Sequence, residues 1–243
     1  MDMDLPLGKG IRIISVDIFD TLLLRNGYSE ERRFMLAAKK IKELCPEIKS
    51  NVRDIFISRY MSHHWLYRLY QQKQLNKEPT IQEILGVQLS MLGDDLISLQ
   101  KLLDAELAVE SDVLALNEDL YSWLKAQAQR GIKVVFFSDM YLSTEIINTL
   151  LLRNSVDLPF DLFVSCESGV SKHQGTAFPW LSNKYNVSAE EILHLGDNYS
   201  ADYNNAIAAG VNALHTPRSA KFYILEDAFK WFDKLWLRSN AYA

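Results

Sequence analysis

Residues 15–23 read SVDIFDTLL, and the fold prediction starts from this segment. Its first three residues are the end of an apolar, β-branched run over residues 11–17, and the last residue of that run is an acid, Asp17. This is the pattern of a buried strand that presents a side chain at its carboxyl end. A second run of the same kind, residues 133–139, follows Gly131, and a glycine there is typical of a helix end. Two buried strands that each end in an aspartate are therefore predicted.

The second half of the chain alternates helical and strand patterns. Apolar residues at helical spacing predict helices over residues 144–153, 176–185 and 202–209. Short apolar runs predict strands at residues 161–165, 192–195 and 211–215. This alternation predicts an α/β fold, with a Rossmann-like, doubly wound parallel sheet and helices on both of its faces.

About a hundred residues between the first two strands have a different pattern, with helical spacing and almost no β-branched runs. Helices are predicted there over residues 29–44, 52–74, 80–92 and 94–107. Breaks between them contain Pro46, Pro79 and Gly93. We therefore expect a core formed by residues 1–28 and 110–217, with an all-helical cap domain inserted at residues 29–109.

The C-terminal segment, residues 218–243, is predicted to be an amphipathic helix. Its apolar face is formed by Phe222, Leu225, Phe229, Phe232 and Trp236. Packing of this face on the core is the expectation. The alternative is an interface, either in a homodimer or with a neighbouring domain.

Composition excludes several classes of protein. The chain has 243 residues, is 48% hydrophobic and carries a formal net charge of -5 without a long basic stretch, which argues against nucleic acid as a partner. No apolar run is long enough to span a bilayer, and the N-terminus lacks the pattern of a secretion signal, so no membrane partner and a cytoplasmic location are expected. Cys45 and Cys166 do not suggest a disulfide framework or a zinc site.

Polar side chains follow the predicted strands at the points where those strands end. They are Asp17 with Thr21, Ser138 with Asp139, Lys172, and Asp197 with Asp202. Ligands of an open parallel sheet bind beyond the carboxyl ends of its strands, so these side chains are expected to converge. Any one of them alone is commonly a helix cap or a turn residue. Together they provide a nucleophile, a hydroxyl, an ammonium and metal-binding carboxylates, which is the set that phosphoryl transfer with magnesium requires.

The same segments resemble the haloacid dehalogenase-like hydrolases, of the type with a helical cap. The resemblance rests on SVDIFDTLL, VVFFSDM, Lys172 within GVSKHQGTAF, and LHLGDNYSADYNNAIAAG, which match that family's four motifs in order and spacing. It covers the predicted sheet domain, and the helical insert occupies the position of the family's cap. The resemblance implies that Asp17 attacks phosphorus and becomes an aspartyl-phosphate that water then hydrolyses.

The resemblance also implies a Mg²⁺ site. The ion would be held by Asp17, by the backbone carbonyl of Phe19 and by Asp197. Asp202 would complete the site, either close to the metal as an outer ligand or by anchoring the lysine of the third motif. Asn198 is a weaker candidate for supporting the ligands of the metal.

The substrate side of the site is implied in the same way. Ser138 and the backbone N–H of Asp139 would hold phosphoryl oxygens, and Lys172 would offset the negative charge. Thr21 is a weaker candidate for orienting the nucleophile's loop. Arg25 is the best-placed cation to meet a substrate anion, with an ion pair across the cap hinge as the equally favoured interpretation.

Phe19 departs from the family pattern, because phosphatases of this type usually carry a second aspartate there as the acid/base. Phenylalanine cannot transfer a proton, and Asp20 and His173 are weaker candidates for replacing that function. The expected function is a magnesium-dependent phosphohydrolase acting on a small phosphorylated metabolite. A sugar phosphate is favoured by the association of first motifs like this one with bacterial surface-polysaccharide assembly.

Two alternatives remain open. Dehalogenases of the family carry a bulky residue at the position of Phe19 and attack carbon without metal, but they lack the acidic metal ligand that Asp197 would supply. The other alternative is a domain that binds a phosphorylated ligand or a protein partner with little catalysis.

Overall fold

The computed structural model describes residues 10–75 and 77–239, so the ends of the predicted core and of the C-terminal segment lie outside the described residues. The described residues divide into a sheet unit, made of residues 10–24, 77–78 and 115–218, and a helical unit, made of residues 25–75, 79–114 and 219–239. The expected boundaries at residues 28 and 110 are thus moved by a few residues each.

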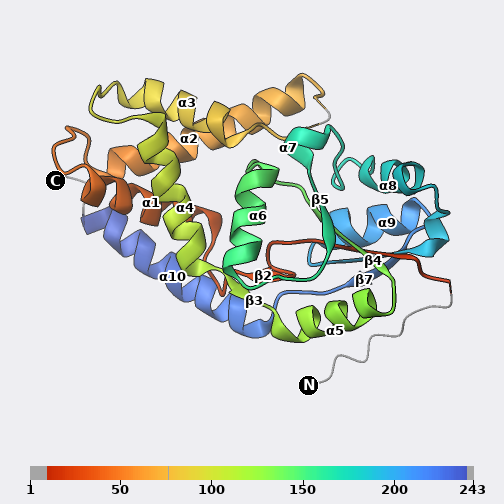
Figure 1. Ribbon diagram of the computed structural model, residues 1–243. Helices are drawn as coiled ribbons and strands as arrows, with labels where there is room; N and C mark the ends of the chain where they lie inside the picture. Colours follow the sequence, from red (N-terminus) through yellow and green to blue (C-terminus); the bar gives the residue numbers. More distant parts are fainter. Residues whose placement is uncertain (1–9, 76, 240–243) are drawn as a thin grey trace. The chain divides into compact units, whose positions relative to one another are not determined.

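A five-stranded parallel sheet forms the sheet unit, in the order β5-β4-β1-β6-β7 (Figure 1). Its strands are β1 (Ile13–Val16), β4 (Lys133–Ser138), β5 (Phe160–Val164), β6 (Ile192–Gly196) and β7 (Asn212–His215). All five predicted strands are present, with bounds shifted by at most two residues. Because β1 pairs with β4 on one side and β6 on the other, Asp17, which directly follows β1, lies at the edge of the sheet between these two strands.

Both faces of the sheet are covered by helices, which confirms the predicted doubly wound α/β fold. The helices of this unit are α5 (Glu118–Gln129), α6 (Thr144–Arg153), α7 (Ser165–Ser168), α8 (Ala177–Tyr185) and α9 (Asn205–Ala208). One face packs Ile13 and Phe137 against Phe178 of α8 and Ala206 of α9. Because side chains alternate along a strand, the fully buried Phe136 points to the opposite face. Burial on both faces explains why the strands read as continuous apolar runs.

Several features of the sheet unit were not predicted, among them the short helix α7, two short strands and the start of one helix. Short strands β2 (Leu23–Leu24) and β3 (Ala115–Leu116) pair antiparallel, and two-residue strands are too short to produce a periodic pattern. The helix expected over residues 202–209 begins earlier, as the π-helical segment η2 (Tyr199–Asn204). It begins there because the side chain of Asn198 accepts hydrogen bonds from the backbone N–H groups of Ser200 and Ala201.

The helical unit contains the four helices predicted for the insert. They are α1 (Glu30–Leu44), α2 (Val52–Gln72), α3 (Ile81–Leu92) and α4 (Leu99–Val113), each begun by a side-chain cap. Helix α4 starts later than predicted, because its N-cap is Ser98, whose side chain accepts a hydrogen bond from the backbone N–H of Lys101. Buried ion pairs join these helices, including Arg59 with Glu106. None of the helices in the described part of the chain is both long and apolar enough to cross a bilayer.

The C-terminal helix α10 (Ala220–Ser239) groups with the helical unit. Phe229 packs on Tyr28 with ring centroids 5.0 Å apart, and Asp233 lies 2.7 Å from Arg32. Gly27 adopts a φ of 88°, and a Cβ there would come within 2.5 Å of Cβ of Leu225. The described contacts of α10 are thus with Tyr28 and with Arg32 of α1, and Gly27 lets the helix approach the chain just before α1. Packing of this helix on the core stays a prediction.

Candidate active site

Three carboxylates meet at the carboxyl edge of the sheet. Asp17 follows β1, Asp197 follows β6, and Asp202 lies in η2. One oxygen of each lies within 4.8 Å of the others. The residues converge because parallel strands end at the same edge, as the spacing of the motifs predicted.

Lys172 joins two of these acids. Its Nζ donates to Oδ1 of Asp17 over 2.5 Å and lies 2.6 Å from Oδ1 of Asp202. Burial alone would lower the pKa of Lys172, but the carboxylates of Asp17, Asp202 and Asp139 outweigh burial and raise it above its ordinary value. The lysine is therefore a buried cation held against the candidate nucleophile.

The loop that carries Lys172 is held by Asp139. The Asp139 carboxylate accepts hydrogen bonds from Ser171 Oγ, Lys172 N and His173 N over 2.9, 3.0 and 2.8 Å. Asn205 Nδ2 donates to the carbonyl oxygen of Lys172 over 2.8 Å. Sequence analysis missed this role of the Asp139 side chain, while the role of its backbone N–H toward phosphate stays a prediction.

Asp202 anchors Lys172, one of the two roles considered for it. Its Oδ1 lies 3.1 Å from Nε2 of His194, and its Oδ2 accepts from the backbone N–H of Asn198 over 2.9 Å. Burial alone would raise the pKa of Asp202, but Lys172 and His194 hold it below its ordinary value. Nδ1 of His194 in turn shares a hydrogen bond of 2.9 Å with Oγ of Ser15.

Ser15 and His194 were not predicted as site residues, although the sequence contains a signal for them. Each is a polar residue inside an otherwise apolar strand, and the two are direct partners in the β1–β6 register. Both are fully buried. Buried polar groups are usually hydrogen-bonded, so polar residues at paired positions of adjacent buried strands indicate a hydrogen bond between the two strands.

Gly196 allows Asp202 to reach this position. A Cβ at residue 196 would overlap the carboxyl group of Asp202. The glycine of the fourth motif is thus required by close approach within the site, since any side chain would push Asp202 away from Lys172.

Asp197 is bound by a residue that sequence analysis did not single out, Arg218. Nε of Arg218 donates to Oδ2 of Asp197 over 2.6 Å, and Nη2 of Arg218 lies 3.2 Å from Oδ2 of Asp20. The only sequence signal is a basic residue shortly after the last strand. Asp20 adopts a φ of 64°, so the segment after Phe19 does not continue as an extended strand.

The other predicted site residues are placed as follows. Phe19 is 7% exposed, and its backbone forms an isolated β-bridge with Leu23. The buried hydroxyl of Thr21 makes no hydrogen bond to the described residues, so its proposed orienting role is not visible as a contact. Ser138 is buried at the end of β4. His173 is exposed next to the Lys172 loop and contributes backbone contacts to it.

Arg25 lies in the helical unit and is engaged in an ion pair there. Its Nη2 lies 3.2 Å from Oε2 of Glu110, and Arg33 also contacts this carboxylate. Burial alone would raise the pKa of Glu110, but the two guanidinium groups lower it. Arg25 is thus in an ion pair, as the second interpretation expected, but the pair lies inside the helical unit and not across the hinge. A contact of Arg25 with a substrate anion stays a prediction.

The donor set fits a divalent cation. Burial, with help from Asp202 and Asp197, raises the pKa of Asp17 to about 8 against the opposite effect of Lys172. Burial likewise raises the pKa of Asp197, against Arg218. Lys172 and Arg218 are two cations among four carboxylates, counting Asp20, so two negative charges remain when all four acids are ionised. Carboxylate oxygens in this number are ligands that Mg²⁺ prefers.

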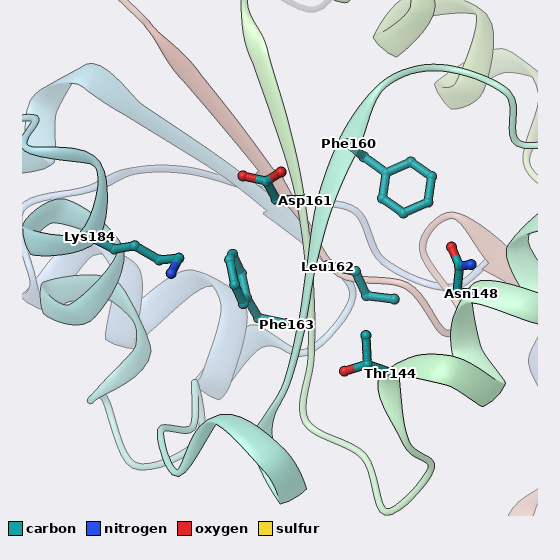
Figure 2. Close-up of a pocket in the computed structure, with 7 residues that line it drawn as sticks. All are labelled: Thr144, Asn148, Phe160, Asp161, Leu162, Phe163 and Lys184. Atoms are coloured by element: carbon teal, nitrogen blue, oxygen red, sulfur yellow. The ribbon is translucent and has the colours of Figure 1, made fainter.

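A separate pocket of about 480 Å³ lies along the edge strand β5 (Figure 2). It is lined by Thr144, Asn148, Phe160, Asp161, Leu162, Phe163 and Lys184. None of the residues discussed above as site residues belongs to it. The candidate chemistry is therefore at the carboxyl ends of β1 and β6, not in this pocket.

No family model matches the chain, and no curated protein matches its sequence. Solved structures do match. The putative HAD-hydrolase YfnB from Bacillus subtilis, bound to magnesium, is 18% identical, with a TM-score of 0.58 over 93% of this chain and 100% of that chain. A mutant of the HAD-family enzyme BT-2542 from Bacteroides thetaiotaomicron, in complex with magnesium and inorganic phosphate, is 15% identical, with a TM-score of 0.58 over 86% and 96%.

Dehalogenases match to a similar degree. L-2-haloacid dehalogenase from Xanthobacter autotrophicus is 13% identical, with a TM-score of 0.56 over 90% of this chain and 83% of that chain. The protein therefore has the α/β fold of the haloacid dehalogenase-like (HAD) hydrolases. Identities this low establish the fold alone, and both magnesium-bound HAD proteins and dehalogenases share it.

Proposed function

We propose that the protein is a magnesium-dependent phosphohydrolase that acts on a small phosphorylated metabolite through an aspartyl-phosphate on Asp17. The observation that carries the proposal is the buried Lys172, held between Asp17 and Asp202, with Asp197 close enough to share a cation with Asp17. A sugar phosphate is the favoured substrate class, because first motifs like this one are associated with bacterial surface-polysaccharide assembly.

Asp17 would act as the nucleophile. One of its carboxylate oxygens forms a bond to phosphorus, and the bond from phosphorus to the leaving oxygen breaks with its electron pair going to that oxygen. Water then attacks phosphorus, which releases inorganic phosphate and restores the Asp17 carboxylate. Lys172 offsets the negative charge in both steps, and Ser138 with the N–H of Asp139 would hold the phosphoryl oxygens.

The residues that would hold Mg²⁺ are Asp17, Asp197 and the backbone carbonyl of Phe19. When bound, the ion would neutralise charge on the phosphoryl oxygens. Asp202 would not bind the ion itself. Its contacts hold Lys172 and the turn at Asn198 in position.

Phe19 limits the substrates that such a site can use. A buried phenyl ring cannot protonate the leaving oxygen, and Asp20 is already ion-paired with Arg218. With neither Phe19 nor Asp20 as the acid, the leaving oxygen would take its proton from water, which favours aryl and acyl phosphates over alkyl phosphates. We expect turnover to rise as the pKa of the leaving group falls.

Dehalogenation is the second candidate, because dehalogenases share the fold and Phe19 is bulky. The carboxylate of Asp197 opposes it, since attack on carbon needs no metal ligand. The two functions separate with a chelator. EDTA should abolish phosphoryl transfer by this protein, whereas release of halide from a 2-haloacid would be unaffected.

The decisive experiment is a screen of sugar, nucleotide and acyl phosphates in the presence of Mg²⁺. Wild type and Asp17→Asn are assayed beside Asp157→Asn, which removes a largely exposed carboxylate in the same unit. Activity is expected in wild type and in Asp157→Asn but not in Asp17→Asn. If no phosphate ester is hydrolysed and beryllium fluoride with Mg²⁺ does not bind, a binding module is the better description.

A further inference from the structure

Arg218 joins two carboxylates that are largely removed from water. Its guanidinium reaches Asp197 over 2.6 Å and Asp20 over 3.2 Å. The side chains of Asp20 and Asp197 are 6% and 10% exposed, whereas that of Arg218 is 35% exposed. Ion pairs between exposed groups contribute little, but a cation that serves buried acids is costly to remove.

The fold holds Arg218 in this position. The strand before it, β7, pairs with β6 as far as His215 opposite Gly196. Thr216 N then donates to the carbonyl oxygen of Gly196 over 2.9 Å, and Nε2 of His215 donates to that of Asp197 over 2.9 Å. The segment leading to Arg218 is therefore bound to the Gly196–Asp197 turn before the guanidinium adds its own contacts.

The hydrogen bonds of the acids show which oxygens remain for a metal. Both oxygens of Asp202 are engaged, Oδ1 with Lys172 and His194 and Oδ2 with Asn198 N. Among the described residues, nothing donates a hydrogen bond to Oδ2 of Asp17 or to Oδ1 of Asp197. Because Arg218 takes Oδ2 of Asp197, it restricts rotation of this carboxylate and leaves Oδ1 as the remaining acceptor.

We propose that Arg218 is a positioning residue for the Mg²⁺ site, which holds Asp197 through Oδ2 so that Oδ1 stays available to the ion, with Asp20 as its anchor. The inference rests on the proposed function, because it takes Mg²⁺ as the resident ion. It also assigns Asp20 to holding Arg218 and not to replacing the missing acid/base. Asp20 keeps a left-handed φ of 64°, which is unfavourable for a residue with a side chain and here accompanies its contact with Arg218.

Two effects of Arg218 on the ion oppose each other. A guanidinium repels a nearby cation, but this one is partly exposed, so water screens the repulsion. Against this, hydrogen-bond partners of metal ligands typically change metal affinity by about 10- to 100-fold. Loss of Arg218 would also leave Asp20 and Asp197 facing each other without the cation between them. We therefore expect the orienting effect to dominate.

The test is calorimetric titration of MgCl₂ into the full chain without substrate. Arg218→Gln is expected to weaken Mg²⁺ binding by about 10- to 100-fold. Arg218→Lys should recover part of the loss, since an ammonium keeps the charge but lacks the planar fork that reaches both acids. Asp20→Asn should weaken binding by a smaller factor, and it keeps the test decisive if Arg218→Gln does not fold.

The matched control is Arg12→Gln. Arg12 lies before β1, at the amino end of the sheet, and pairs with Glu191 over 3.4 Å. Its variant should bind Mg²⁺ as wild type does. Equal or tighter binding by Arg218→Gln would overturn this inference and leave the proposed function standing. Absence of Mg²⁺ binding by wild type would overturn both.

Discussion

Lys172 Nζ lies 2.5 Å from Oδ1 of Asp17 and 2.6 Å from Oδ1 of Asp202, and the lysine side chain is 3% exposed. A single buried ammonium thus links the candidate nucleophile to the acid of the fourth motif. Its removal would leave two buried carboxylates without this cation.

We predict that Lys172→Gln lowers the free energy of unfolding by about 3–5 kcal/mol in the absence of metal, because breaking a buried ion pair leaves uncompensated charge. Added Mg²⁺ should restore part of the loss, since a bound cation stabilises the folded state. Urea denaturation with and without Mg²⁺ measures both effects. Lys133→Gln, which removes a half-exposed partner of Asp161, should cost less than about 1 kcal/mol. A similar cost for the two variants would contradict the importance of burial.

Gly196→Ala is predicted to disrupt the site through sterics alone. The new Cβ would overlap the carboxyl group of Asp202, so that residue must move away from Lys172. We expect a destabilisation of about 1–3 kcal/mol, as for other overpacked sites, together with a loss of Mg²⁺-dependent phosphatase activity. Gly86→Ala is the control, because a Cβ there meets nothing within 4 Å and alanine favours a helix. Wild-type stability and activity in Gly196→Ala would show that Asp202 tolerates displacement.

His63 in the helical unit is a buried histidine that is held neutral. Burial lowers the pKa of His63 to about 3, and Arg59, His64 and Arg33 act in the same direction. The carboxylate of Glu30, 3.3 Å from Nε2 and 37% exposed, does not offset these effects. The unfolded chain binds a proton at His63 with an ordinary pKa of about 6.5.

The stability of the helical unit should therefore fall on acidification. Between about pH 6.5 and pH 3 the unfolded state binds one more proton at His63 than the folded state, so the free energy of unfolding decreases by up to about 1.4 kcal/mol per pH unit. Above about pH 6.5, His63 is neutral in both the folded and the unfolded state, so it no longer lowers the free energy of unfolding. Denaturant unfolding of His63→Gln across this range should show a smaller slope than wild type. Equal slopes for wild type and His63→Gln would mean that His63 protonates in the folded state.

Phe19→Asp is predicted to raise activity on alkyl phosphates, because it supplies an acid where the fold places none. General acid–base assistance contributes about 100- to 10,000-fold, and we expect a gain of at least tenfold in this partly unsuited, buried position. Rates across leaving groups of graded pKa should become less steep than in wild type. Phe19→Asn, which is polar but transfers no proton, should show no such gain. Unchanged or lower activity of Phe19→Asp would remove position 19 from the acid/base role.

The helices and strands were largely predictable because their signals are local. Side-chain caps at Ser29, Asn51 and Thr80, and β-branched runs that end in an acid, bias each segment without reference to the rest of the chain. The pattern was weaker where local signals compete, and α4 begins five residues later than predicted because Ser98 supplies the cap. The strands β2 and β3 were missed because two residues carry no periodicity.

Sequence patterns alone predicted the order of the strands along the chain, the inserted helices, and the acids and the lysine that end at one edge of the sheet. The partners of these groups depend on the folded chain. Lys172, in a loop, meets Asp17 across 155 positions. Ser15 meets His194 across 179 positions through the register of the adjacent strands β1 and β6. The contact of Arg218 with Asp197 also joins two separate segments of the chain. The packing of α10 on α1 depends on the close approach that Gly27 allows. Such contacts leave little local pattern, because their energies arise from burial and geometry that exist only once the chain has folded.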